Sequence, residues 1–296
     1  MPAASLPGAE RAGLRLVSAE RRTFSGPAEF LSDPANRAAV SSYLSDLTRP
    51  YPSELSGAPP VLVSPEQGQS YGEMAEALIG ALVPADQPVG LLVLAFSIHD
   101  VQPGRATATY LSHVCPGTPM AFAICDQGSA AAYSALRIAR DYPAPDGCPR
   151  SLVIVVEQAA LPYGDGTALP AQHRGVAMLF ENGTGGAGAG GARLVALVQR
   201  PDLAPAAVAG QAAADLAELS AGYPQVRLVL SRPLATAWPG HPRDGVRVGP
   251  ADQPSTGIWW QLLDELDAAG DRPGLLVAAD YDPQLRCLCL AAFEPV

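Results

Sequence analysis

The sequence contains no lysine, because all 19 of its basic residues are arginine. This bias indicates a codon preference rather than a function. The 29 acidic residues outnumber the basic ones, giving a net charge of −10. Nucleic acids and anionic membrane surfaces are both bound through clustered positive charge, and no such cluster is present. The sequence therefore predicts a protein that binds neither nucleic acid nor a membrane.

Long apolar runs are also missing. No segment approaches the roughly 18 apolar residues of a membrane span, and Pro2, Pro7 and Gly8 interrupt the N-terminal stretch where a signal peptide would have its apolar core. A cytoplasmic protein is expected. The five cysteines are odd in number and lack C-x-x-C spacing, which predicts reduced thiols rather than disulfides or a zinc site. Two of them, Cys287 and Cys289, are expected on one face of a strand.

Apolar residues make up 48% of the 296 positions, enough to bury a large core. The spacing of Tyr71, Met74, Leu78 and Leu82 predicts a helix over residues 71–82. Short apolar runs indicate strands at 14–19, 89–96, 119–125, 151–157 and 175–181, and further helices are expected at 30–46, 106–113 and 129–140. Buried strands that alternate with helices predict a mostly parallel sheet with helices on its faces.

The glycine-rich stretch 182–191 predicts a flexible connection between two domains, 1–191 and 192–296. The second part repeats the alternation of strands and helices. Strands are expected at 192–198, 226–231, 274–280 and 286–293, and helices at 205–220 and 256–269. The last two strands lie close in the sequence, which predicts a closing hairpin.

Between Val89 and Phe180 the sequence contains the segments LLVLAFSIHD, AFAICDQGSAAAYSALRIA, SLVIVVEQ and HRGVAMLFE. In this order they resemble the N-terminal half of ketosynthase III, a branch of the thiolase-fold condensing enzymes. The C-terminal stretch STGIWWQLLDELDAAGDRPGLLVAADYDPQLRCLCLAAF is similar to its last helix and closing hairpin. The resemblance implies a thiolase-like α/β fold, in which two βα-rich halves pack as α/β/α/β/α layers.

In that family a cysteine opens a buried helix, whose backbone dipole favours the thiolate that accepts an acyl group from a thioester. Counting forward from Phe122 places this position at Gly128. Counting backward from Leu136 places it at Ser129, which we prefer. Neither residue has a thiol, and the nearest cysteine, Cys125, is expected to be a buried structural one.

Ser129 admits two interpretations. Its hydroxyl could be acylated if a base lay within hydrogen-bond reach, and Asp126, His99 and His241 are the candidates. The simpler interpretation is that Ser129 is a helix N-cap that accepts hydrogen bonds from the backbone of Ala131 or Ala132.

The resemblance also locates the family's other catalytic positions. The histidine position falls on Ser231 or Arg232, and the asparagine position falls on Gln253. The family's hairpin has a glycine-rich turn that shapes the oxyanion region, whereas Pro283 removes a backbone donor here. With four elements changed together, Claisen condensation is not expected.

Two hypotheses of function follow from the resemblance, both within acyl thioester metabolism and natural-product biosynthesis of the polyketide or fatty-acid type. The first is a non-catalytic subunit that pairs with an active ketosynthase III-like paralogue. The second is an acyltransferase that uses Ser129 to move an acyl group from coenzyme A or acyl carrier protein to an oxygen or nitrogen nucleophile. We expect no bound cofactor or metal, and an acyl phosphopantetheine as a possible substrate. We also expect a homodimer, or a heterodimer with a ketosynthase III-like paralogue, with an acyl carrier protein as a possible further partner.

Overall fold

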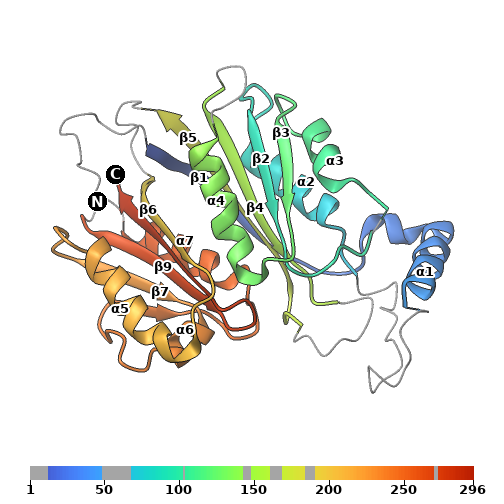
Figure 1. The fold of residues 1–296 in the computed structure, drawn as a ribbon. Coiled ribbons are helices and arrows are strands. Elements are labelled where there is room, and N and C mark those ends of the chain that lie inside the picture. Colours follow the sequence, from blue (N-terminus) through green and yellow to red (C-terminus); the bar gives the residue numbers. More distant parts are fainter. Residues whose placement is uncertain are drawn as a thin grey trace.

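The computed structural model describes residues 13–48, 68–102, 104–142, 148–160, 169–183, 191–269 and 273–296. Within these ranges, ten strands form one mixed sheet in the order β3-β2-β4-β5-β1-β6-β10-β9-β7-β8. Figure 1 shows the first five strands and their helices on one side of the molecule, and the C-terminal strands on the other.

The elements of the first half are β1 (Gly13–Phe24), α1 (Pro34–Thr48), α2 (Tyr71–Leu82), β2 (Leu91–Ala95), α3 (Thr107–Val114), β3 (Met120–Ile124), α4 (Ala131–Asp141), β4 (Arg150–Glu157) and β5 (His173–Gly183). Those of the second half are β6 (Ala192–Arg200), α5 (Val208–Leu219), β7 (Val226–Leu230), α6 (Arg232–Ala237), β8 (Val246–Val248), α7 (Gly257–Ala269), β9 (Leu275–Asp282) and β10 (Cys287–Pro295). The described residues also include the 3-10 turns η1 (Glu29–Ser32), η2 (Gly128–Ala130) and η4 (Pro205–Ala207).

The two halves share one topology. In the first, β2 is parallel to β3 and β4, and β4 is antiparallel to β5, which pairs with β1. In the second, β7 is parallel to β8 and β9, and β9 is antiparallel to β10, which pairs with β6. The halves meet where β1 pairs with β6. The division into domains stays a prediction, since the strands form one continuous sheet.

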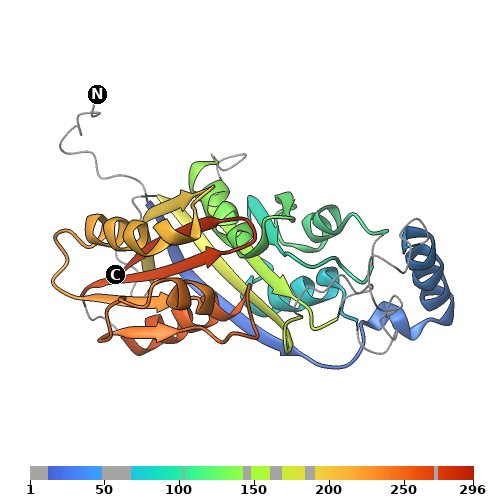
Figure 2. The same cartoon turned by 60° about the horizontal axis from the view of Figure 1, so that its bottom comes forward.

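Three apolar clusters separate the layers. One packs α2 and α3 on the outer face of the first half-sheet, and another packs α5 and α6 on the outer face of the second. The third lies between the half-sheets and contains α4 and α7 (Figure 2), where the rings of Tyr133 and Trp259 are 4.9 Å apart. Adjacent residues such as Leu92 and Val93 point to different clusters, as strand alternation requires. This gives the expected α/β/α/β/α layers.

Most expected elements are present, with small shifts at their ends. Helix α2 has the predicted bounds, and β9 and β10 form the predicted hairpin. Strand β1 is longer than expected, and the predicted helix at residues 30–46 is a 3-10 turn followed by α1. Helix α6 and strand β8 were missed because six and three residues are too few for a periodic signal. The expected connection at 182–191 lies largely outside the described residues.

Among the described helices, none is long and apolar enough to cross a membrane.

Candidate functional site

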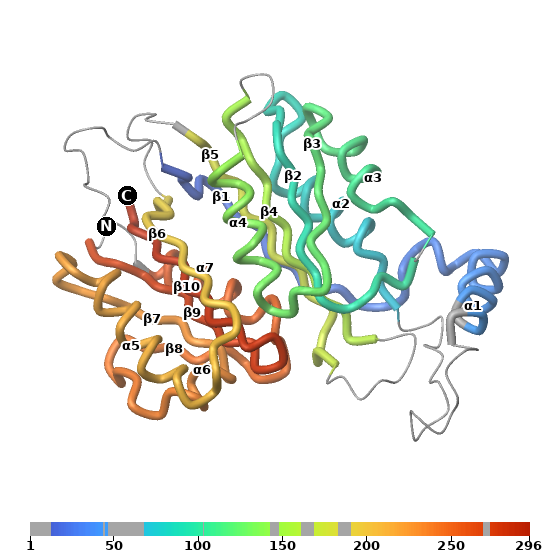
Figure 3. The backbone as a smooth tube through the Cα atoms, in the orientation of Figure 1, coloured from blue at the N-terminus to red at the C-terminus, as the bar shows by residue number. Residues whose placement is uncertain are grey.

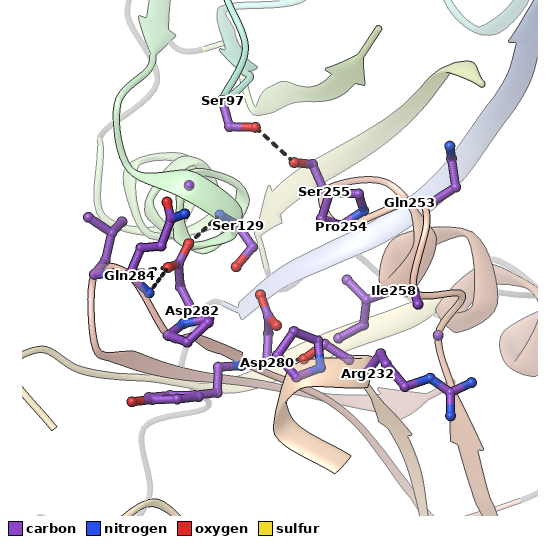
Figure 4. Close-up of a pocket in the computed structure, with 18 of the residues that line it drawn as sticks. Ser97, Ser129, Arg232, Gln253, Pro254, Ser255, Ile258, Asp280, Asp282 and Gln284 are labelled. Atoms are coloured by element: carbon purple, nitrogen blue, oxygen red, sulfur yellow. Dashed lines mark hydrogen bonds between the residues drawn. The ribbon is translucent and has the colours of Figure 1, made fainter. Parts of the chain in front are cut away.

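A pocket of about 510 Å³ lies where strands of both halves end. Its lining follows the carboxyl ends of four parallel strands: Ser97 after β2, Ser129 after β3, Ser231 after β7 and Gly249 after β8. The end of β9 and the hairpin turn complete the wall. Functional groups in open α/β sheets gather at this edge. The four positions selected from the sequence, Gly128, Ser129, Ser231 and Gln253, all line this pocket (Figure 4).

Ser129 lies in the 3-10 turn η2, which precedes α4, and it is half-buried. Its N-cap interpretation is wrong, because no side-chain cap bond forms at either η2 or α4. The hydroxyl instead lies near the carboxylate of Asp280 and stabilises its charged form, and the backbone N–H donates to Oδ2 of Asp282 at 3.2 Å. Ser129 therefore faces two carboxylates.

Asp280 is the more deeply buried of the two, with 3% of its surface exposed. Burial raises the pKa of its carboxyl above the usual range, and the nearby hydroxyls of Ser129 and Ser231 oppose that shift. Desolvation penalises the charged form, whereas donors stabilise it. Asp280 is thus a buried carboxyl group near two hydroxyls.

Asp282 closes the turn that follows β9. Its Oδ1 accepts hydrogen bonds from the backbone N–H groups of Gln284 and Leu285, both at 3.0 Å, while Oδ2 accepts the bond from Ser129. The approach depends on Gly128, whose φ is +48° and where a Cβ would lie 1.9 Å from Asp282 Oδ2. A residue without a side chain at 128 is required for this contact.

Ser231, at the predicted histidine position, is the N-cap of α6. Its hydroxyl accepts hydrogen bonds from the N–H groups of Leu234 at 3.3 Å and Tyr281 at 3.4 Å. It also stabilises the charged form of Asp280. Its neighbour Arg232 lines the pocket, but its guanidinium points away from Asp280 (Figure 4). Ser231 thus positions Asp280 and has no imidazole to act as a base.

Gln253, at the predicted asparagine position, is buried, and its amide is hydrogen-bonded to the backbone. Its amide nitrogen donates to the backbone carbonyls of Asp252 at 2.7 Å and Gln172 at 3.3 Å. Figure 4 places Pro254 and Ser255 between Gln253 and Ser129. The amide donor that an oxyanion would need is thus already engaged.

The other sequence candidates have different outcomes. Cys125 is exposed, so the expectation of a buried cysteine is wrong, and its thiol donates to Asp126 at 3.4 Å. Of the three candidate bases, only Asp126 lines the pocket, at a φ of +58°. The imidazole of His241 instead packs edge-on against the ring of Trp238. His99 is exposed and does not line the pocket.

Asp280 and Asp282, which lie near Ser129 in the pocket, were not among the residues selected from the sequence. A signal for them exists: the motif Asp-Tyr-Asp follows the apolar run of β9, and alternation places both aspartates on one face of that strand. Acidic side chains at the end of a buried strand face either solvent or a site. Here they face the pocket.

The opposite wall is held by Glu157, the last residue of β4, which is fully buried. Its carboxylate accepts hydrogen bonds from the N–H groups of Ser255 at 2.9 Å and Thr256 at 3.1 Å, directly before α7. The Ser255 hydroxyl lies 3.2 Å from that of Ser97, at the end of β2. Glu157 thereby stabilises the start of α7 and fixes the pocket wall between the halves.

The charged groups and hydrogen-bond donors that line the pocket limit its chemistry. Its described lining has carboxylates and hydroxyls but neither a thiol nor an imidazole. In the described part of the chain, no group of three or more His, Cys, Asp or Glu side chains could hold a metal ion. The arrangement can accept a proton from Ser129 or hold its hydroxyl, but it places negative charge beside the serine.

No family model and no curated protein matches this sequence. Solved structures are similar to it in fold. The tetronic acid condensing enzyme AbyA1 has a TM-score of 0.60 at 14% identity, over 95% of this chain and 99% of that one. The 3-oxoacyl-(acyl carrier protein) synthase III FabH from Pseudomonas aeruginosa has a TM-score of 0.58 at 16% identity, over 95% and 98%.

The acyltransferase ChlB3 is similar over 95% of this chain and 97% of its own, with a TM-score of 0.57 and 16% identity. Identities this low show the fold and not the activity. Coverage of almost the whole length of both chains shows that the similarity in fold includes both halves. The chain has the thiolase-like fold of the ketosynthase III-type condensing enzymes.

Proposed function

We propose that this protein is a cytoplasmic, non-catalytic subunit of acyl thioester metabolism that pairs with an active ketosynthase III-like partner and does no Claisen chemistry. The observation that carries the proposal is the hydrogen bond from the Ser129 N–H to Asp282. In acyl transfer, the backbone N–H of the nucleophile helps to bind the developing oxyanion. Here a carboxylate already holds that donor.

Electrostatics adds to this argument. An oxyanion that formed beside Ser129 would lie against the carboxylate of Asp282, in a pocket where Asp280 is also acidic. Two like charges about 4 Å apart repel by about 4 kcal/mol at the effective dielectric near a protein surface. Enzymes of this class place donors, not acceptors, where charge develops. The pocket is therefore poorly suited to acyl chemistry.

A partner could add to the sheet at β3. This strand pairs with β2 on one side and is the edge strand of the described sheet. It is apolar in sequence, MAFAI, yet Met120 is 44% exposed and Ala123 is also exposed. Apolar edge strands are templates for pairing with another chain. This surface supports a dimer with a paralogue or with a second copy.

A second function, acyl transfer through Ser129, is favoured by one observation, the position of Ser129 and Asp280 in the lining of the same pocket, where the Ser129 hydroxyl stabilises the charged form of Asp280. In this mechanism Asp280 takes the hydroxyl proton as Oγ attacks the thioester carbonyl of an acyl phosphopantetheine. The carbon–sulfur bond then breaks and the thiolate of coenzyme A or acyl carrier protein takes up the proton. An oxygen or nitrogen nucleophile would next receive the acyl group from the serine ester.

One experiment separates the two functions. The protein is incubated with a panel of acyl-coenzyme A and acyl-carrier thioesters and its intact mass is measured, with Ser129→Ala as the matched control. We expect no acyl adduct on the wild type. A stoichiometric adduct that is absent from Ser129→Ala would overturn the non-catalytic proposal and establish the acyltransferase.

The partner is tested by coexpression with a ketosynthase III encoded nearby and by size-exclusion chromatography with light scattering. A stable heterodimer is expected. Recovery of the two chains in separate peaks at micromolar concentration would contradict pairing. It would leave the conclusion about Ser129 intact, since that rests on the mass measurement.

A further inference from the structure

Two cysteines lie close together on β10. Cys287 and Cys289 are two positions apart on one face of the strand, and their sulfur atoms are 3.7 Å from each other. A rise of about 3.3 Å per residue places their Cα atoms about 6.6 Å apart. Disulfides span Cα separations of about 4.4–6.8 Å. The pair can therefore be bridged, at the wide end of the range.

The two thiols differ in access and in acidity. Cys289 is 1% exposed, whereas Cys287 is half-buried and reachable from solvent. A hydrogen bond with Cys289 lowers the pKa of the Cys287 thiol, and Arg137 contributes in the same direction. The same hydrogen bond, together with burial, raises the pKa of Cys289. Cys287 is thus the thiol that forms a thiolate first, and Cys289 is a protected neighbour.

The pair is also placed next to the pocket. In the hairpin register, Cys287 lies opposite Asp282 and Cys289 opposite Asp280. Residues directly opposite each other in an antiparallel pair point to the same face. The two thiols therefore lie on the same face of the hairpin as Asp280 and Asp282, the two carboxylates near Ser129. A covalent change at the thiols would alter the hairpin that carries both aspartates.

We infer that Cys287 and Cys289 form a reversible dithiol–disulfide site that reacts with low-molecular-weight disulfides. The Cys287 thiolate attacks one sulfur of the small disulfide, forming a mixed disulfide and releasing one thiol. Cys289, on losing its proton, then displaces the second thiol and closes the Cys287–Cys289 bond. The protein loses two electrons and two protons, and the small disulfide becomes two thiols.

The geometry favours a bond that is easily reduced again. Closing the sulfurs from 3.7 Å to about 2.05 Å requires the strand to contract locally, since the Cα atoms start near the limit for a disulfide. Strained disulfides have more oxidising potentials and are the labile ones. The site is thus expected to respond to the ratio of disulfide to thiol, rather than to serve as a permanent crosslink.

The test uses the full chain and oxidised glutathione at graded ratios to the reduced form. Samples are quenched in acid and alkylated with a maleimide under denaturing conditions. The mass of the intact protein is then measured by mass spectrometry, and the disulfide is located by peptide mapping. In the wild type we expect two of the five thiols to escape alkylation together, with no retained glutathione and with Cys287 and Cys289 in one linked peptide.

The variants separate the two steps. Cys289→Ser is expected to stop at a mixed disulfide, gaining one glutathione on Cys287, and Cys287→Ser is expected to lose the two-thiol transition. Cys125→Ser, which alters an exposed thiol elsewhere, should leave the transition unchanged. Full alkylation of both cysteines at every ratio, or a disulfide mapped to another pair, would overturn the inference. Circular dichroism of each variant confirms that it is folded.

Discussion

The backbone N–H of Ser129 donates to the Asp282 carboxylate at 3.2 Å, although 153 residues separate the two in the sequence. The bond joins the turn after β3 to the end of β9, and so connects the two halves at the pocket. It is possible because Gly128 leaves room for Asp282 Oδ2. The contact therefore depends on three residues from two distant segments.

Replacing Gly128 by alanine should break this contact. A Cβ would lie 1.9 Å from Asp282 Oδ2, and a φ of +48° costs an L-residue about 1–2 kcal/mol. With the displaced hydrogen bond added, we expect unfolding free energy to fall by about 2–4 kcal/mol, measured by urea titration. Gly80→Ala, in the open on α2, is the control and should raise it by about 0.5–1 kcal/mol. Equal effects of the two changes would contradict the argument.

Glu157→Gln should destabilise the protein strongly. The buried carboxylate accepts hydrogen bonds from Ser255 and Thr256, and an amide can offer only one oxygen to those donors. An unsatisfied buried group costs about 1–3 kcal/mol, so a loss of that size is expected in chemical denaturation. Glu181→Gln is the control: that residue pairs with Arg15 and Arg150 but is 32% exposed, and its loss should cost less than about 1 kcal/mol.

Asp100 predicts a pH dependence of stability. Burial raises the pKa of its carboxyl to about 6, against hydrogen bonds from the backbone of Gln102 and Tyr71. Because the folded state binds this proton more tightly than the unfolded state, its contribution to stability falls as the pH rises from about 4 to about 7, by at most about 3 kcal/mol. The loss is complete about one pH unit above the folded pKa.

The measurement is the difference in unfolding free energy between the wild type and Asp100→Asn, at intervals between pH 4 and 8. The wild type should lose stability relative to the variant across the lower part of this range and show a constant difference above about pH 7. A difference that does not change between pH 4 and 6 would show that Asp100 titrates normally.

Met120→Lys should prevent pairing through β3. The change places a charge on an exposed position of the edge strand, and natural edge strands use lysine to block such pairing. We expect this change to convert the proposed dimer to a monomer in light scattering, with the melting temperature of the monomer little changed. Val195→Lys makes the same change at an exposed position of the interior strand β6 and should leave the oligomeric state unaltered. A dimer that survives Met120→Lys would place the interface elsewhere.

The sequence determined the elements and their layering. Helix α2 has the bounds that its apolar spacing predicts, and the buried strands β2 and β4 contain the predicted apolar runs. These features are local, because the period of apolar residues reports which face of an element is buried. The sequence also placed Gly128, Ser129, Ser231 and Gln253, which line one pocket.

Tertiary structure decided what those residues do. The φ angles of Asp126 and Gly128 are positive, and the chain continues from them into a 3-10 turn. As a result, the Ser129 hydroxyl does not cap α4 but lies near Asp280. Cys125 is exposed because it follows the edge strand β3, and strand order is set by pairing between distant segments. Residue types and their periodicity are properties of short segments and can be read from the sequence. The hydrogen-bond partner of each polar group depends instead on which distant segments the sheet brings together.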